Sequence, residues 1–315
     1  MPVPNLRGVT PAIVTPFDEK GDVDYDSLLS YCSWLKTIPG VTGIVVNAHA
    51  GEGTSLSEEE RATITREVKA AVPDLHIVAG VGGDGTRVVA REAELAAKAG
   101  ADSLLVFPAL ASLRFGYQEG SVQDRFREVL RAGGLPTIVF NFPGTTKATY
   151  PIELLLELFA MDGVFALKDG VRDMIRWDVE TPIIRKNFPD IQILTCQDEF
   201  LLHTMWESDG ALVGYAALIP ELMVELLEKA KAHDYDAAKE VYDRMLPITR
   251  AVYHRSSHIE STTAMKIGLV QRGIIASATV RSPLMPLEDS APGQIRAALA
   301  GAGVSLAETD SLVGA

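Results

Sequence analysis

The regular alternation of apolar runs with amphipathic stretches is the feature that most restricts the fold of this 315-residue chain. Eight short runs are almost continuously apolar, which is typical of parallel strands that are buried on both faces. They lie at Gly8–Thr15, Gly43–Asn47, His76–Val81, Ser103–Phe107, Thr137–Asn141, Val164–Lys168, Ile191–Thr195 and Ala211–Gly214. Helical patterns separate them, and their spacing leaves no room for a second sheet. The alternation therefore predicts an α/β fold of the TIM (β/α)8 barrel type.

The helical patterns also suggest where the domains end. The segment Ser57–Glu60 has the capping-box pattern of a helix start. Six more helices are predicted before the chain changes character, at Thr86–Ala99, Glu119–Ala132, Ile152–Phe159, Met174–Phe188, Glu199–Ser208 and Glu221–His233. Beyond them the strand pattern does not return, and helices are predicted at Tyr235–Tyr253, Ile259–Arg272 and Pro292–Ala300. We therefore expect a barrel over residues 1–233, a C-terminal helical appendage over residues 234–303 and a tail over residues 304–315.

Charge and cysteine content narrow the range of partners. A formal net charge of −13 argues against nucleic acid or an anionic membrane as a partner, because little in the chain would neutralise phosphates. No apolar stretch approaches the roughly 20 residues that span a bilayer, and the N-terminus lacks the apolar core of a secretion signal. Cys32 and Cys196 are too few for a disulfide framework and are typical of a reducing compartment. We expect a cytoplasmic protein with a small-molecule ligand.

Lys168 is the strongest candidate for chemistry. It follows the apolar residues Val164–Leu167 without a break and precedes Asp169. Active sites of α/β barrels lie at the carboxyl ends of the strands. Withdrawal from water at such a position favours a neutral amine, which can attack a ketone. The alternative is a lysine whose charged end reaches the rim of the barrel beside Asp169.

Two other loops also carry candidate residues. Residues 47–54 follow the second run, and their small side chains and backbone amides suit a carboxylate or phosphate. His49 in this loop can titrate near neutral pH, although a hydrogen-bonded spacer is an equal alternative. Residues Gly80–Gly85 fit the GxGxxG dinucleotide fingerprint. The next strand ends at Phe107 without the acidic residue that would hold a ribose, so a dinucleotide site is disfavoured.

No metal or other cofactor is predicted. The six histidines are scattered along the chain. His254 and His258 have helical spacing but lack the glutamate of an HExxH zinc motif. A solvated helix face is the better interpretation of that pair.

Five segments taken together resemble the dihydrodipicolinate synthase / N-acetylneuraminate lyase family. The resemblance extends from about Gly8 to Leu287, with the family's order and spacing. The matching segments are Thr10–Phe17, Gly51-Glu52, Asn141-Phe142-Pro143, Leu167-Lys168-Asp169 and Arg281–Leu287.

The resemblance implies a barrel with a C-terminal helical domain, a Schiff base between Lys168 and a 2-oxo acid such as pyruvate, and a homotetramer built as a dimer of dimers. It also implies that pocket positions are occupied by His49, Ala50, Gly51, Phe140 and Leu212.

The chain departs from the family pattern at several positions that bear on its function. The family's Gly-Thr-Thr-Gly-Glu motif is Ala48–Glu52 here, without either threonine hydroxyl. A tyrosine that moves protons near the imine is replaced by Phe140, and a second relay tyrosine by Leu110. The arginine that holds the aldehyde's carboxylate in dihydrodipicolinate synthases is replaced by Thr145. These changes argue against lysine biosynthesis and against sialic acid cleavage.

The sequence therefore predicts a carbon–carbon or carbon–oxygen lyase of the class I aldolase type, outside lysine biosynthesis. We expect it to act on a 2-oxo acid through a Lys168 Schiff base, with aldolase or hydratase-aldolase chemistry. The alternatives are a dehydratase of 2-oxo-3-deoxy sugar acids and a binding or regulatory protein that has lost turnover. Because no tyrosine relay is expected, His49 is the candidate for proton transfer.

Overall fold

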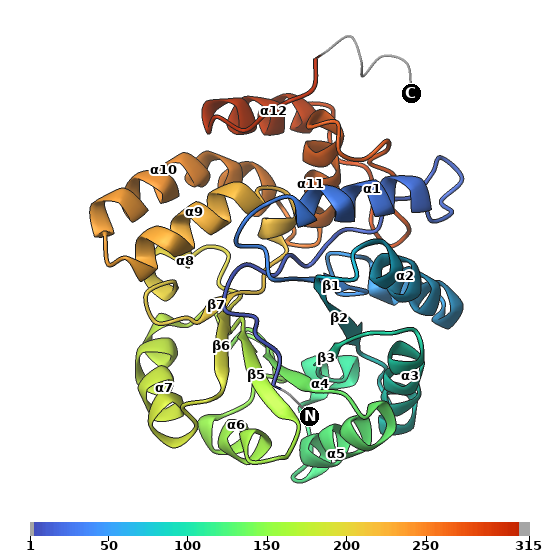
Figure 1. Ribbon diagram of the computed structural model, residues 1–315, viewed down its shortest axis with the longest axis vertical. Coiled ribbons are helices and arrows are strands. Elements are labelled where there is room, and N and C mark those ends of the chain that lie inside the picture. Colours follow the sequence, from blue (N-terminus) through green and yellow to red (C-terminus); the bar gives the residue numbers. More distant parts are fainter. Residues whose placement is uncertain (1–2, 309–315) are drawn as a thin grey trace.

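The computed structural model describes residues 3–308 and is built around one curved sheet of seven parallel strands (Figure 1). The strands pair in chain order, from β1 to β7, so each neighbour in sequence is also a neighbour in the sheet. Their bounds are β1 Gly43–Val46, β2 His76–Val81, β3 Ser103–Val106, β4 Thr137–Asn141, β5 Val164–Asp169, β6 Gln192–Thr195 and β7 Gly210–Ala211. The predicted α/β class with a parallel sheet is confirmed.

Helices surround the sheet, and Figure 1 shows the strands at the centre with the last helices gathered at one side. Helix α1 Tyr25–Lys36 precedes the first strand, and the next helices are α2 Glu58–Ala71, α3 Thr86–Lys98, α4 Leu110–Phe115, α5 Ser121–Gly133 and α6 Ile152–Phe159. They are followed by α7 Met174–Asn187, α8 Leu201–Thr204, α9 Pro220–Lys231, α10 Tyr235–Val252, α11 Glu260–Gln271 and α12 Ala291–Gly301. Helices α10, α11 and α12 pack on one another, and α9 packs on α10.

The first predicted strand takes a different form. Residues 8–15 make isolated bridges instead of a continuous ladder, with Val9 paired in parallel to both Val41 and Ala211. Pro11 interrupts the segment because it has no amide hydrogen to donate to a ladder. The segment still hydrogen-bonds to both edges of the sheet, since Thr10 N donates to Ala211 O at 2.8 Å and Ile13 N donates to Val45 O at 3.0 Å.

Local signals placed some helix ends well and missed two helices. The capping box of α2 is present, because Ser57 Oγ accepts from Glu60 N and Glu60 Oε2 accepts from Ser57 N. Helices α1 and α4 were not anticipated, and α8 is shorter than the predicted 199–208.

Both cysteines are buried and unpaired. No helix within residues 3–308 has the length and apolarity needed to cross a bilayer. Most of the predicted tail lies outside the described residues.

The apolar segment after β3 is only partly exposed. Phe107 is buried, whereas Leu110 and Phe115 on α4 are 45% and 73% exposed. This leaves two large apolar side chains on the surface of one short helix.

Strand β5 carries Lys168 to the carboxyl edge of the sheet. Every residue of β5 is buried. Its register places Lys168 opposite Phe140 on β4 and opposite Leu194 on β6. The loops that follow β1, β4, β5 and β6 therefore meet around the Lys168 side chain.

Candidate active site

A cavity of about 440 Å³ opens at this edge of the sheet, and Lys168 lines it. This volume lies within the usual range for small-molecule sites. The lining comes from several loops and from the C-terminal helices, including His49, Phe140, Arg172, Asp198 and Tyr253. Segments that are far apart in the sequence thus contribute to one site.

The Lys168 amine has no hydrogen bond or ion pair with any of residues 3–308. The residue is only 5% exposed, and Nζ lies 4.0 Å from the centre of the Phe140 ring. Asp169 does not pair with it, because Asp169 Oδ1 accepts from Val171 N at 3.0 Å. Burial raises the pKa of Asp169 to about 7. An unpaired amine at the end of a buried strand has the accessibility that a nucleophile needs.

His49 lies against two aromatic rings of the same cavity. Its ring centre is 4.6 Å from that of Phe107 and 5.7 Å from that of Phe142. The ring is surrounded by protein but open to solvent in the cavity. Burial and the charge of Lys168 lower the pKa of His49 to about 4, and solvent in the cavity screens part of that effect. The imidazole is therefore neutral at pH 7 and can accept a proton, in contrast to the unperturbed pKa expected from the sequence.

Phe140 forms the wall beside Lys168 together with Phe107 and Phe142, at ring distances of 5.4 and 4.5 Å. It offers a π face to the amine and no hydroxyl. Leu110 lines a neighbouring cavity with His49. Neither side chain can pass a proton.

A polar wall that the sequence did not reveal faces the cavity from the loops after β5 and β6. Arg172 Nη2 pairs with Asp198 Oδ2 at 2.8 Å, and Arg172 Nε pairs with Glu199 Oε2 at 2.9 Å. Burial raises the pKa of Asp198. The neighbouring thiol of Cys196 is also buried, which raises its pKa to about 11 and makes it a poor nucleophile. This wall supplies charged hydrogen-bonding groups within reach of a ligand.

Glu52 holds the second loop in place. Its backbone has a left-handed φ of 53°, and its buried carboxylate pairs with Lys266 Nζ on α11 at 2.5 Å. The other carboxylate oxygen accepts from Arg281 N at 2.8 Å. Lys266 and Arg281 also lie over the ring of Phe17, at 4.1 and 4.5 Å. Three of the segments that carry the family resemblance, around Phe17, Glu52 and Arg281, therefore meet in one structural cluster.

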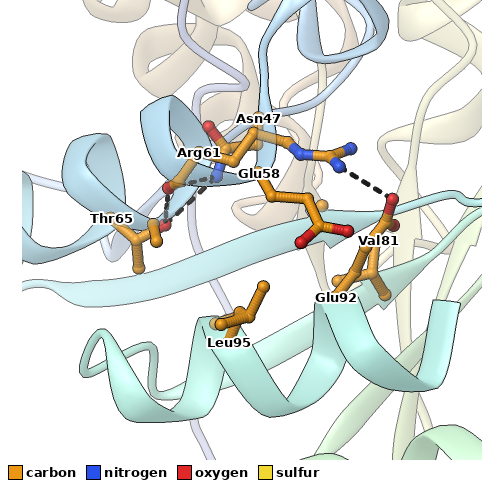
Figure 2. A pocket seen from close by; sticks show the side chains of 10 residues that line it. Asn47, Glu58, Arg61, Thr65, Val81, Glu92 and Leu95 are labelled. Atoms are coloured by element: carbon orange, nitrogen blue, oxygen red, sulfur yellow. Dashed lines mark hydrogen bonds and ion pairs between the residues drawn. The ribbon is translucent and has the colours of Figure 1, made fainter. Parts of the chain in front are cut away.

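The glycine-rich loop after β2 is already occupied by a side chain of the protein. Gly82 N and Gly83 N both donate to Glu92 Oε2, at 2.8 and 3.0 Å. Figure 2 shows Glu92 on α3 reaching Arg61 on α2, with 2.9 Å between Oε1 and Nη2. The two amides that would hold a pyrophosphate are satisfied by this carboxylate. The loop therefore lacks the free amides that a dinucleotide site uses.

The structure brings together four of the six site residues named from the sequence. Lys168, His49, Ala50 and Phe140 line one cavity. Gly51 lies behind it, where its carbonyl oxygen accepts from Thr15 Oγ1 at 2.7 Å. Leu212 is fully buried in the core. The residues missed are Arg172, Asp198 and Tyr253, and no local pattern in the sequence marks them.

Comparisons with known proteins show which family the chain matches. The sequence model of the dihydrodipicolinate synthetase family matches residues 5–302. The 4-hydroxy-tetrahydrodipicolinate synthase of Natronomonas pharaonis is 28% identical over 94% of this chain and 97% of its own. The corresponding synthase of Bartonella bacilliformis is 28% identical over 95% and 99%. The chloride-inhibited dihydrodipicolinate synthase of Acinetobacter baumannii, solved with pyruvate, has a TM-score of 0.84 and 25% identity over 95% and 100%.

These relatives contradict the expected function. A lyase outside lysine biosynthesis was predicted from Phe140, Leu110 and Thr145, but the curated relatives over nearly the whole chain are named 4-hydroxy-tetrahydrodipicolinate synthase. The names of these relatives also support neither alternative function, the dehydratase of 2-oxo-3-deoxy sugar acids or the binding protein without turnover. Thr145 lies on the exposed surface, whereas Arg172 lines the cavity.

Proposed function

Because the chain belongs to the dihydrodipicolinate synthetase family, we propose that it is a 4-hydroxy-tetrahydrodipicolinate synthase that binds pyruvate as a Schiff base on Lys168. Proteins of this family are class I aldolase-type lyases that act through a Schiff base, so the enzyme class predicted from the sequence is confirmed. The observation that carries the proposal is the unpaired Lys168 amine, which ends β5 and opens into the cavity.

The name of the product defines the second substrate. A tetrahydrodipicolinate is a six-membered nitrogen ring with two carboxylates and seven carbon atoms. Pyruvate supplies three carbons and one carboxylate. The partner must then be a four-carbon 2-amino acid with an aldehyde at its far end, and the aldehyde oxygen becomes the 4-hydroxyl group.

The residues of the cavity suggest how the steps divide. The Lys168 amine attacks the ketone carbon of pyruvate and water leaves, which gives an iminium that withdraws electrons from the methyl group. We infer that the neutral His49 imidazole takes the methyl proton. The resulting enamine carbon attacks the aldehyde, whose oxygen gains a proton. The amine of the partner then attacks the iminium carbon, closes the ring and releases Lys168.

Recognition of the substrates uses groups on different walls. Ala50 and Phe140 contact the bound pyruvate in our proposal, and direct contact by Gly51 and Leu212 stays a prediction. Arg172 is the guanidinium available for the partner's carboxylate, and its own ion pairs with Asp198 and Glu199 leave acidic oxygens beside it for an ammonium. The absence of the tyrosine relay also stays a prediction.

We further infer a closed (β/α)8 barrel in which residues 8–13 act as the eighth strand and close the sheet. Their hydrogen bonds to β7 and to β1 support this. We propose residues 234–303 as a separate helical domain and residues 304–315 as a tail. A cytoplasmic location stays a prediction.

Leu110 and Phe115 support a contact between subunits, because exposed apolar side chains on one short helix are typical of such a contact. The homotetramer itself stays a prediction from the family resemblance.

Turnover is the test of this proposal. Purified protein is incubated with pyruvate and the four-carbon amino aldehyde, and the cyclic product is followed by mass spectrometry. We expect product from the wild type and none from Lys168→Ala. Pyruvate bound at Lys168 without any cyclic product would contradict the proposed partner.

A further inference from the structure

Tyr253, directly after α10, places a buried phenol in the wall of the Lys168 cavity. Its hydroxyl has one partner within residues 3–308, the Met265 sulfur at 3.8 Å, which is a weak acceptor. The neighbouring Tyr215 is different, because its hydroxyl bonds to Met245 O and to Thr249 Oγ1, both at 3.0 Å. Buried tyrosine hydroxyls usually find a hydrogen-bond partner. The one proton of the Tyr253 hydroxyl is therefore held only by a weak acceptor, which a stronger acceptor on a ligand can replace.

This hydroxyl lies at one corner of the cavity. A Cβ placed on Gly214 would be 3.4 Å from the Tyr253 hydroxyl and 3.4 Å from Ala50 Cβ. Gly214 and Ala50 both line the same cavity. The backbone amides of His49 and Ala50 donate to no other group among residues 3–308. Two unused backbone amides and one weakly bonded hydroxyl thus belong to this corner, where the sequence lacks both threonine hydroxyls of the resembled family.

A carboxylate is the ligand group that these donors suit. A 2-oxo acid must bring its carboxylate into the site when Lys168 attacks the adjacent ketone. Arg172 is the other cationic side chain of the lining, and it is already paired with Asp198 and Glu199. Burial and the nearby carboxylate of Asp198 hold the pKa of Tyr253 well above its usual range, so the phenol stays protonated and can donate. The 2-oxo acid's carboxylate therefore meets neutral donors at this corner, and Arg172 is assigned to the carboxylate of the second substrate.

We propose that the Tyr253 hydroxyl binds the carboxylate of the 2-oxo acid while Lys168 holds its ketone carbon. The inference rests on the proposed function, since it requires a 2-oxo acid at Lys168. It assigns part of substrate recognition to a residue that follows the first of the C-terminal helices. It also predicts that the site prefers 2-oxo acids to simple ketones because of this hydroxyl.

Borohydride trapping at Lys168 tests the inference with two probes. Pyruvate carries the carboxylate, and acetone has the same ketone without it. A hydrogen bond to a charged group accounts for roughly a 10- to 100-fold difference in affinity. For Tyr253→Phe we therefore expect the half-saturating concentration of pyruvate to rise by about that factor. The half-saturating concentration of acetone should stay within about twofold of the wild-type value.

Tyr215→Phe is the matched control. It removes a buried hydroxyl from the neighbouring ring, at a centre-to-centre distance of 5.3 Å, but Tyr215 does not line the cavity. We expect it to lower the melting temperature and to leave both trapping curves unchanged. Melting curves of Tyr253→Phe verify that the variant is folded.

The possible failures are distinguishable. If the wild type traps pyruvate at Lys168 and Tyr253→Phe traps it with the same concentration dependence, the inference is overturned and the proposed function stands. Equal weakening for pyruvate and acetone would also overturn it, because the hydroxyl would then serve the fold. If the wild type does not trap pyruvate at Lys168, both the inference about Tyr253 and the proposed function are wrong.

Discussion

Glu52→Gln should destabilise the protein strongly although it changes a single atom type. Both oxygens of the Glu52 carboxylate are in use, one by Lys266 Nζ at 2.5 Å and the other by Arg281 N at 2.8 Å. Both side chains of the Glu52–Lys266 pair are fully buried. Glutamine has only one acceptor, so its amide nitrogen must face one of these two donors. Lys266 would also lose its counter-charge in a place where burial already lowers its pKa to about 8.

The size of the effect follows from this burial. Removing one partner of a buried ion pair typically costs about 3–5 kcal/mol in unfolding free energy, because the other charge is left uncompensated. At roughly 2–3 °C per kcal/mol for a chain of this size, the melting temperature should fall by about 6–15 °C. Glu67→Gln is the control, because its pair with Arg66 is exposed on both sides. Exposed pairs contribute less than about 1 kcal/mol.

Calorimetry at pH 7 measures both variants, and Lys266→Met in the Glu52→Gln background completes the test. With no buried charge left, most of the lost stability should return. A fall of less than about 2 °C for Glu52→Gln, or no recovery in the double variant, would refute the view that this pair anchors the second loop to α11.

Two further predictions concern His49 and assembly. The folded pKa of His49, about 4, lies below its unfolded value of about 6.5, so the unfolded state binds more protons between these values and the wild type loses stability as pH falls through them. His49→Asn should flatten that loss in urea titrations between pH 4 and 7 and should lower kcat by about 10²- to 10⁴-fold. If stability depends on pH equally in the wild type and in His49→Asn, and kcat is unchanged, His49 is only a spacer in the loop. Light scattering should return a tetramer of the 33.9 kDa chain, and Phe115→Ser combined with Leu110→Ser should reduce its mass. A monomeric wild type would contradict the assembly.

Local patterns were sufficient for most of the strands and for the position of Lys168 at a strand end, whereas its catalytic role rested on the family resemblance and stays a prediction. Continuous apolar runs identify buried parallel strands whatever lies around them, and the end of such a run is an edge of the sheet. The Ser57 capping box is equally local, and it forms as predicted. The segment at residues 8–15 was less well predicted, because Pro11 removes a donor that a regular ladder needs.

The other half of the site depends on contacts between distant segments. Tyr253 reaches the cavity from the end of α10, more than 80 residues beyond Lys168, and nothing near it in the sequence marks the site. The same is true of Glu92, whose carboxylate fills the glycine-rich loop. The pKa of His49 could not be predicted either, since it depends on burial among aromatic rings and on Lys168. The argument from Thr145 rested on one position, and the sequence around Arg172 did not show that this residue lines the cavity.

The central claim is that Lys168 forms the imine with pyruvate. The most direct measurement is peptide mapping by mass spectrometry after incubation with pyruvate and borohydride. The account predicts one reduced pyruvyl adduct per chain, on the peptide that contains Lys168, and no adduct in Lys168→Ala. An adduct on Lys147 or Lys186, or one that persists in Lys168→Ala, would contradict it.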